Sequence, residues 1–430
     1  MKKILYIAAA ATLLMTSCQK TDVLNVAEDT IDFSTQVGKL TKANDEYDPL
    51  GTLKGQGFRV WTVAHFTQGQ WKDGQIYRGM ENLYVRYDSD YTTNPWIINS
   101  NERYFWPQAQ QYLQFYTISS NVMKPNSTDE YWVDDVRYSD HFTKPDGATE
   151  ITGLDLPEYT VNDVADDDVM VADVKRQTKD DGSGNKTKTV SPYFRHTMTK
   201  VEFKFKKGTP SQNAAPVAST VILKEIKTSA LSYKGSLDVT YGAGTTEMSF
   251  EWTPSTGEGT TKVFSYTPST VVYLDPKGKE IPVVDDYPTE ELAENQYCKI
   301  GDTVYAYTKE TEDATQLTWN VTTDYETYNG DVLSADDFES YVTWYMIPQD
   351  LDEEQTVEIT YIADGKVIPQ IFKLTVNHST DLTKDWTEEM WVKYNVTITP
   401  QKVFFNPEVK PWDTDQDDDG TDDTDVDMEN

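Results

Sequence analysis

The sequence predicts an all-β protein built from β-sandwiches. Its 430 residues include 27 Tyr and 11 Trp, and aromatic residues are enriched in strands. Several short segments alternate apolar and charged residues, which is typical of a strand with one face in a core and one in water. Long stretches of apolar residues at helical spacing are hard to find. Many short strands separated by turn-rich segments are typical of sandwiches.

The first eighteen residues predict export. Met1-Lys2-Lys3 is basic, residues 4–14 are apolar except for Thr12, and small polar residues precede Cys18. This run is too short to anchor the chain across about 30 Å of hydrocarbon, so it reads as a removable signal. It resembles the lipobox of bacterial lipoproteins, in which the cysteine is acylated, for example with palmitate, and becomes the mature N-terminus. We expect residues 1–17 to be removed and Cys18 to carry lipid; the alternative is an ordinary secretory signal with an accidental cysteine.

Charge and cysteine content restrict partners and stabilisation. The formal net charge of −34 argues against nucleic acid and anionic membrane surfaces as ligands. Membrane attachment would therefore depend on the lipid. Once Cys18 is acylated, Cys298 is the one remaining thiol, so we expect no internal disulfide and stability from apolar burial.

The strand candidates follow one another along the chain. The turn Asp364-Gly365 supplies the positive backbone angles of a tight hairpin between two of them. A serine followed three residues later by an acid predicts one helical turn at 334–339. The segments that we expect to be extended are 30–34, 58–66, 112–118, 201–206, 220–226, 357–361, 371–376 and 394–405.

Length and composition predict two domains. About 410 mature residues exceed what one core usually organises. Residues 175–189 contain no apolar side chain and cannot contribute to a core. We expect an interdomain linker there, with the tip of a long hairpin as the alternative. The predicted divisions are a signal (1–17), an N-terminal segment with a removable strand (18–46), a first sandwich that ends in the linker (47–189), a second sandwich (190–412) and an acidic disordered tail (413–430).

Several motifs, taken together, resemble the fimbrillin-like proteins of the Bacteroidales, the type V pilin superfamily. One departure is the segment Trp386-Thr387-Glu388-Glu389-Met390-Trp391, where the family often has a glycine. The matching features are the lipobox with a short Ile31-Asp32-Phe33 strand and Thr41-Lys42-Ala43, then Tyr104-Phe105-Trp106-Pro107 with Leu113-Gln114-Phe115-Tyr116, Asp168-Val169-Met170-Val171-Ala172, the run from Phe194 to Phe203, Tyr345-Met346-Ile347-Pro348-Gln349, and the run from Tyr394 through Asn406-Pro407 to Trp412.

This resemblance implies two tandem transthyretin-like sandwiches and a fimbrial subunit, or an accessory tip or anchor protein, in cell-surface adhesion. It also implies an outer-membrane lipoprotein whose N-terminal strand is cut away, so that other pilin subunits can bind by strand donation. The candidate strand is 31–37, and the candidate processing sites are Lys39 and Lys42. The well-studied processing enzyme of the family prefers arginine, but the first arginine after the signal, Arg59, lies inside a predicted strand. Either a protease accepts lysine or the subunit is not processed.

The C-terminal tail does not suit strand donation. Residues 413–430 contain nine Asp, one Glu and no basic residue, so this tail would enter an apolar groove only at high cost. A donated strand would have to end near Trp412, or the chain is a minor, tip or anchor subunit. The spacing of Asp415, Asp417, Asp419 and Asp423 resembles part of a calcium loop. Weak calcium binding and an acidic tail with this spacing by chance are both open, and we expect no other cofactor.

The sequence gives little support for catalysis. The four histidines have no metal-ligand spacing, and phosphate-binding and nucleophile motifs are missing, so we predict no enzyme activity. The rival function is a glycan-binding lipoprotein of the outer membrane, possessing aromatic rings that stack on sugars. Trp71 and Trp96 stand in turn-like contexts and are the candidate stacking residues; the alternative is that these tryptophans belong to a core.

Overall fold

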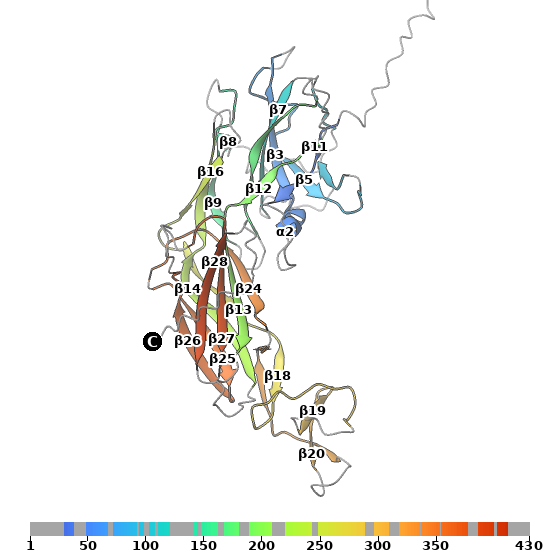
Figure 1. Ribbon diagram of the computed structural model, residues 1–430, viewed down its shortest axis with the longest axis vertical. Coiled ribbons are helices and arrows are strands. Elements are labelled where there is room, and N and C mark those ends of the chain that lie inside the picture. Colours follow the sequence, from blue (N-terminus) through green and yellow to red (C-terminus); the bar gives the residue numbers. More distant parts are fainter. Residues whose placement is uncertain are drawn as a thin grey trace, which may run out of the picture.

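The chain is all-β, as predicted. Its computed structural model describes residues 30–37, 49–67, 72–92, 94–98, 103–107, 111–120, 142–143, 148–161, 167–179, 189–208, 220–242, 248–288, 296–308, 318–335, 337–352, 354–376, 386–399 and 402–411. Within these ranges the single helix is α2 (Pro49–Gln56). No helix of the described residues has the length and apolarity needed to cross a membrane. The molecule is elongated, with the first domain, the second domain and a small tip following one another from top to bottom (Figure 1).

The first domain is a ten-stranded sheet that closes on itself. The order is β11-β1-β6-β5-β3-β7-β10-β12-β2, with β4 on β3. At one end of this order β1 pairs with β11, and at the other end β2 pairs with β12. Because β1 and β2 are consecutive in the chain, as are β11 and β12, the two ends meet and the sheet closes. The strands are β1 (Asp32–Phe33), β2 (Gln36–Val37), β3 (Phe58–His65), β4 (Gln75–Ile76), β5 (Leu83–Tyr87), β6 (Trp96–Ile98), β7 (Tyr112–Ser119), β10 (Met170–Gln177), β11 (Thr189–Val190) and β12 (Tyr193–His196).

Both faces of this closed sheet are buried. Phe58 and Val60 of β3 lie in one apolar cluster inside the ring, whereas Trp61 and Val63 lie in a second cluster on the outside. Residues alternate between the two faces of a strand, so β3 has no polar face and all but its last residue are buried. Burial extends even to Arg59 and Thr62, the two polar side chains inside β3.

A second sheet covers the outer face of the ring. Trp61 lies 4.1 Å from Phe142 and Tyr116 lies 5.0 Å from Tyr241, measured between ring centroids. This sheet mixes strands from both halves of the chain in the order β16-β15-β9-β8. Its members are β8 (Phe142–Thr143), β9 (Gly153–Thr160), β15 (Lys234–Tyr241) and β16 (Met248–Pro254).

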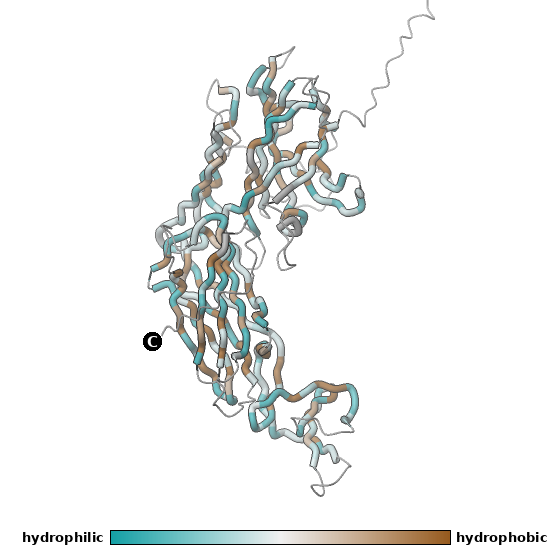
Figure 2. The backbone as a smooth tube through the Cα atoms, viewed as in Figure 1, coloured by the Kyte–Doolittle hydropathy of each residue, from teal (hydrophilic) through white to brown (hydrophobic). Residues whose placement is uncertain are grey.

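The second domain is a sandwich of two sheets. One has the order β24-β13-β27-β28, and the other has the order β17-β14-β25-β26 with β23 beside β14. Rings stack across it, as in the pair Phe372 and Phe405 at 4.7 Å. Along its strands, hydrophilic and apolar residues alternate (Figure 2). The strands are β13 (Thr199–Lys207), β14 (Val221–Ser232), β17 (Thr261–Tyr266), β23 (Asp331–Val332), β24 (Glu339–Met346), β25 (Thr356–Ala363), β26 (Lys366–Lys373), β27 (Met390–Ile398) and β28 (Val403–Pro411).

A small tip extends from the far end of this sandwich. The pair β18 (Val271–Leu274) and β22 (Glu326–Asn329) forms its base. Beyond this base lies a three-stranded sheet of β19 (Tyr297–Ile300), β20 (Thr303–Thr308) and β21 (Thr318–Val321). The tip therefore occupies the end of the molecule opposite the first domain (Figure 1).

The predicted hairpin at 357–376 is confirmed. β25 and β26 pair antiparallel from Thr356↔Lys373 to Ala363↔Lys366. Asp364 and Gly365 have φ angles of 52° and 70°, as a two-residue hairpin turn requires.

The predicted exposure of the charged face of β13 is wrong. Lys200 and Glu202 are each 3% exposed. The Lys200 ammonium lies 3.7 Å from the centre of the Trp391 ring, and Glu202 accepts a hydrogen bond of 3.0 Å from the Trp391 indole. A large aromatic neighbour on β27 thus covers charges that the alternating pattern places in water.

The position of the domain division is also wrong, because 175–189 is not a linker. The flanking strands β10 and β12 pair antiparallel in one sheet, so this stretch connects two strands of a hairpin, the alternative noted above. The first domain continues to His196, and the second begins with β13. No helical turn forms among the described residues of 334–339.

Candidate functional site

The candidate functional site is the seam where the first domain closes. We name residues 30–37 the closing ribbon and residues 189–196 the companion ribbon. The two run parallel, with the pairs Asp32↔Thr189, Phe33↔Val190, Gln36↔Tyr193 and Val37↔Phe194. The backbone N–H of Ser34 donates to Val190 O at 2.8 Å, and the Ser34 and Ser191 hydroxyls hydrogen-bond each other.

The other edge of the closing ribbon is held more sparsely. Phe33 pairs with Trp96 of β6, Thr30 forms a bridge with Phe105, and the Ile31 N–H donates to Tyr104 O at 2.9 Å. The closing ribbon thus lies between β6 and the companion ribbon. Without it, these two neighbours would present unpaired backbone groups to each other across a gap.

Two apolar side chains fix the closing ribbon in the core. Ile31 is 3% exposed and Phe33 is 1% exposed. The Phe33 ring meets Phe58 at 5.7 Å and Phe115 at 6.0 Å, both edge to face, a favoured aromatic geometry. Burying each such side chain stabilises the fold by about 1.5–3 kcal/mol.

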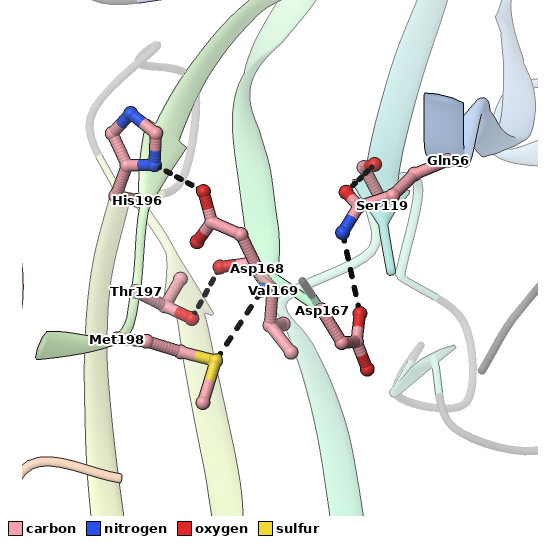
Figure 3. A network of polar contacts seen from close by, with 8 residues as sticks. All are labelled: Gln56, Ser119, Asp167, Asp168, Val169, His196, Thr197 and Met198. Atoms are coloured by element: carbon pink, nitrogen blue, oxygen red, sulfur yellow. Dashed lines mark hydrogen bonds and ion pairs between the residues drawn. The ribbon is translucent and has the colours of Figure 1, made fainter. Parts of the chain in front are cut away.

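A buried polar network joins the first domain to the second sheet, and Figure 3 shows its part formed by Gln56, Ser119 and Asp167. The Asp167 carboxylate accepts hydrogen bonds from Ser120 Oγ at 2.9 Å, from Tyr159 OH at 2.8 Å and from Gln56 Nε2 at 3.3 Å. Ser119 Oγ donates in turn to Gln56 Oε1 at 3.0 Å. This carboxylate, 2% exposed, therefore ties together the end of α2, β7 and β9.

A second buried pair lies where the chain passes between domains. His196, the last residue of β12, donates from Nδ1 to Asp168 Oδ2 at 2.6 Å, with both residues at most 1% exposed. Thr197 Oγ1 donates to Val169 O at 2.7 Å, and the Val169 N–H donates to Met198 Sδ at 3.4 Å (Figure 3). Segment 167–169 thus holds the junction between β12 and β13.

A bidentate ion pair bridges the same junction on its surface. Arg195 Nε and Nη2 donate to the Glu389 carboxylate at 2.6 and 2.8 Å. Glu389 has a φ of 57°, a conformation that favours glycine. This is the segment where the sequence departs from the fimbrillin-like pattern, and the ion pair offsets the cost of a left-handed glutamate.

Variants of Glu389 should separate strain from ion pairing. Glu389→Ala keeps the left-handed backbone and loses the half-exposed pair, so we expect a loss of about 1 kcal/mol in the free energy of unfolding. Glu389→Gly loses the same pair but relieves a strain of about 1–2 kcal/mol. Urea denaturation should therefore find Glu389→Gly at least as stable as Glu389→Ala; the reverse order would contradict the strain.

Burial raises the pKa of Tyr84 to about 12, against the opposing charges of Arg59 and Arg86. The folded state favours the neutral phenol, so this contribution to stability is present below pH 10 and is lost as the pH rises through about 12. We expect the urea midpoint of the first domain to fall from pH 9 to 11.5. Tyr84→Phe, which loses the hydrogen bond to Gln56 O, should start lower and fall less; an equal fall would contradict the assignment.

Most of the predicted site residues lie outside the described residues: Cys18, Lys39, Lys42, Trp71, Asp415, Asp417, Asp419 and Asp423. Trp96 is described, and its expected role as an exposed stacking residue is wrong. It is 5% exposed and packs against Phe58 and Tyr87 at 5.4 and 5.3 Å, because β6 turns it into the ring. Arg59 is 3% exposed within β3.

Sequence reasoning did not predict that the carboxylates of Asp167 and Asp168 are buried. Asp167 and Asp168 stand in the run 166–168 of three aspartates, which looks like solvated surface in a chain with 72 acidic residues. One signal was present: Val169, Met170, Val171 and Ala172 follow directly, and an acid next to a buried strand is a candidate for burial.

Comparison with solved structures finds fimbrial proteins. A fimbrial protein from Bacteroides vulgatus is 13% identical, with a TM-score of 0.43 over 89% of this chain and 99% of that chain. A fimbrial assembly protein from Parabacteroides distasonis is 9% identical, with a TM-score of 0.31 over 89% of this chain and 98% of that chain. No protein-family model and no curated protein matches the chain.

Proposed function

We propose that the chain is a fimbrial subunit, or an accessory tip or anchor protein, that assembles by strand exchange at the seam of its first domain and serves in cell-surface adhesion. One observation carries the proposal: a short N-terminal ribbon closes a sheet that would be open without it. An unpaired edge beside an apolar trough binds an added strand through backbone hydrogen bonds and side-chain burial together. The closing ribbon fills such a place in the isolated chain.

The short ladders of the closing ribbon favour its replacement. β1 and β2 contain two residues each, and Ser34 and Thr35 between them pair in neither strand. A donated strand with alternating apolar residues along the whole seam would form more ladder pairs and bury more apolar surface. Exchange would then be downhill once the closing ribbon is free to leave.

Two of the four edge strands of the second domain are less suited to this role. β26 contains Pro369 and β28 contains Pro407 and Pro411, whereas the edge strands β17 and β24 contain no proline. Proline cannot donate a ladder hydrogen bond and is one of the devices that block strand addition at an edge. These prolines disfavour strand addition at β26 and β28.

The processing step needs a cut after the closing ribbon. Lys39 and Lys42 follow it directly in the sequence, so a cut at either would leave residues 30–37 held by non-covalent contacts alone. The buried Arg59 lies in the central β3, where a cut would destroy the ring. We therefore propose a lysine-accepting protease, acting on a lipoprotein attached through Cys18 to the outer membrane.

The mature form tests the proposal. Filaments sheared from the cell surface should contain this chain in a detergent-resistant ladder, with an N-terminus near Leu40 or Ala43. Lys39→Gln/Lys42→Gln should abolish the ladder and leave the lipidated precursor, whereas Lys54→Gln, in α2, is the matched control. An N-terminus at lipidated Cys18 within filaments would indicate an anchor. A chain found only as a lipidated monomer would contradict assembly and favour a surface lipoprotein.

A further inference from the structure

The tip carries an aromatic cluster that the strand-exchange seam does not use. Tyr305 and Tyr307 lie two residues apart on β20, and Trp319 of β21 is in register with Tyr307. Side chains at these positions share one face of the sheet. Tyr287 comes from the segment that crosses to this face after pairing beside β19 through Val283 and Val284. We name Tyr287, Tyr305, Tyr307 and Trp319 the tip cluster.

The rings contact one another directly. Tyr287 lies 5.1 Å from Tyr305 at an interplanar angle of 81°, and 6.2 Å from Trp319 at 28°. Tyr307 lies 5.2 Å from Trp319 at 69°. Rings at these angles enclose Trp319 between a nearly parallel and an edge-on neighbour, so the cluster holds a fixed shape.

The tip cluster is open to solvent. Tyr287 is 47% exposed, and Val321, in register with Tyr305, is 67% exposed. The rings of Tyr305, Tyr307 and Trp319 are half-buried. Exposed apolar groups that gather in one place mark interaction sites more often than scattered ones do.

Hydrogen bonds within the tip occupy the polar ends of three of these four rings. The Trp319 indole N–H donates to Pro288 O at 3.2 Å, and the side chains of Tyr287 and Tyr305 hydrogen-bond each other. The parts of these rings that remain for a ligand are mainly their π faces. A π face is electron-rich and attracts a cation.

Two carboxylates adjoin the tip cluster. Asp285 and Asp286 directly precede Tyr287 and are exposed. Lys299 is the one described basic residue of the segment 282–325, and its ammonium donates to Gly301 O and lies 5.0 Å from the Tyr273 ring. The described surface therefore offers carboxylates beside aromatic faces, which suits a cationic ligand and repels an anionic one.

We propose that the tip cluster binds exposed lysine or arginine side chains of a partner polypeptide. A ring face and a carboxylate attract the same cationic group, and arginine can also stack on Tyr or Trp. This site is separate from the strand-exchange seam, at the opposite end of the molecule (Figure 1). It would let one surface bind a partner while the other assembles.

Peptide binding to the full-length chain tests the proposal. The probe is a fluorescein-labelled peptide, Gly-Lys-Gly-Lys-Gly-Lys-Gly, with its fully Nε-acetylated form as the neutral control. We expect saturable binding of the lysine peptide, roughly ten times weaker binding of the acetylated form, and loss of affinity as ionic strength rises. Tyr287→Ala should weaken binding roughly two- to fivefold, and Asp285→Asn/Asp286→Asn should weaken it to a similar degree without removing a ring.

Two controls keep the test decisive. Tyr91→Ala removes another exposed tyrosine, 57% exposed, far from the tip and should leave affinity unchanged. At Trp319 the variant is Trp319→Phe, which keeps an aromatic ring, because Trp319→Ala would disturb the tip. Circular dichroism checks the fold of each variant. Three results would each overturn the proposal. The acetylated peptide could bind as tightly as the lysine peptide, or Tyr91→Ala could lose as much affinity as Tyr287→Ala. Competition by maltoheptaose would indicate a carbohydrate site instead. These binding results do not depend on strand exchange, so they would stand even if the chain did not polymerise.

Discussion

Phe33→Ala is expected to lower the free energy of unfolding of the first domain by about 3–5 kcal/mol, the usual cost of truncating a buried Phe. Its ring is 1% exposed and contacts Phe58 and Phe115 in the middle of the closed sheet. The neighbouring rings cannot all move into the vacated volume, because backbone ladders hold their strands. Asp32→Asn, one residue earlier on the outward side of the ribbon, should change stability by less than about 1 kcal/mol.

Hydrogen exchange, resolved by residue, provides the measurement. In Phe33→Ala the amides of β6 and the companion ribbon should lose protection first, because they lie on either side of the loosened closing ribbon. The amides of β27 in the second domain should keep theirs. A uniform loss of protection over both domains would contradict a local seam.

The same substitution also tests exchange itself. A labelled peptide of residues 28–38 should bind a chain that has been cut after Lys39 and stripped of its own ribbon. The Phe33→Ala form of the peptide should fail to bind, while the Asp32→Asn form should bind. If the stripped chain closes without any peptide and both peptides fail, the ribbon is dispensable and strand exchange at this seam is excluded.

Asp168→Ala is the second variant with a large expected effect, a loss of about 3–5 kcal/mol, as is typical when one partner of a buried pair is removed. His196 would keep a buried Nδ1–H without the 2.6 Å acceptor. Asp168 Oδ1 has no hydrogen-bond partner among the described residues, so the hydrogen bond from His196 is the main interaction of this carboxylate. The loss should loosen the junction between β12 and β13.

A double-mutant cycle checks that prediction. Asp168→Ala/His196→Ala should cost clearly less than the sum of the single variants, because the second truncation removes the group that the first left unpaired. Thermal unfolding should also show the two domains melting further apart in Asp168→Ala. Additive single costs would contradict direct coupling between the two side chains.

Part of the second domain follows from the sequence. Alternation locates β13 and β25, and Asp364-Gly365 defines a turn whose backbone angles agree with the expectation. These elements have local signals, because period and turn chemistry depend on neighbouring residues. Whether their charged faces are exposed to solvent has no such local signal. The face of β13 that was expected to be exposed is covered by Trp391, which lies almost 190 residues away in the sequence. The run expected at 371–376 overlaps only the end of β26, and the single run expected at 394–405 is a hairpin of β27 and β28.

The closure of the first domain was harder to predict than its strands, because β3 and β7 agree with the extended segments expected at 58–66 and 112–118. A sheet buried on both faces lacks the alternation that shows which side faces a core. The second sheet combines β9 with β15 and β16, a pairing between distant segments that no local pattern encodes. The polar stretch 175–189 has the composition of a linker, but only the long-range pairing of β10 with β12 shows that it joins two strands of one hairpin.

The parallel register of the closing and companion ribbons has a mechanical consequence. A strand pulled along its own axis in this geometry loads its backbone bonds in shear, so that they must break together, whereas a strand peeled from one end loses them singly. A donated strand in the same register would resist traction from a flowing medium far better than its equilibrium affinity suggests. Tethered chains stretched in a force probe should then yield at the seam in one abrupt step.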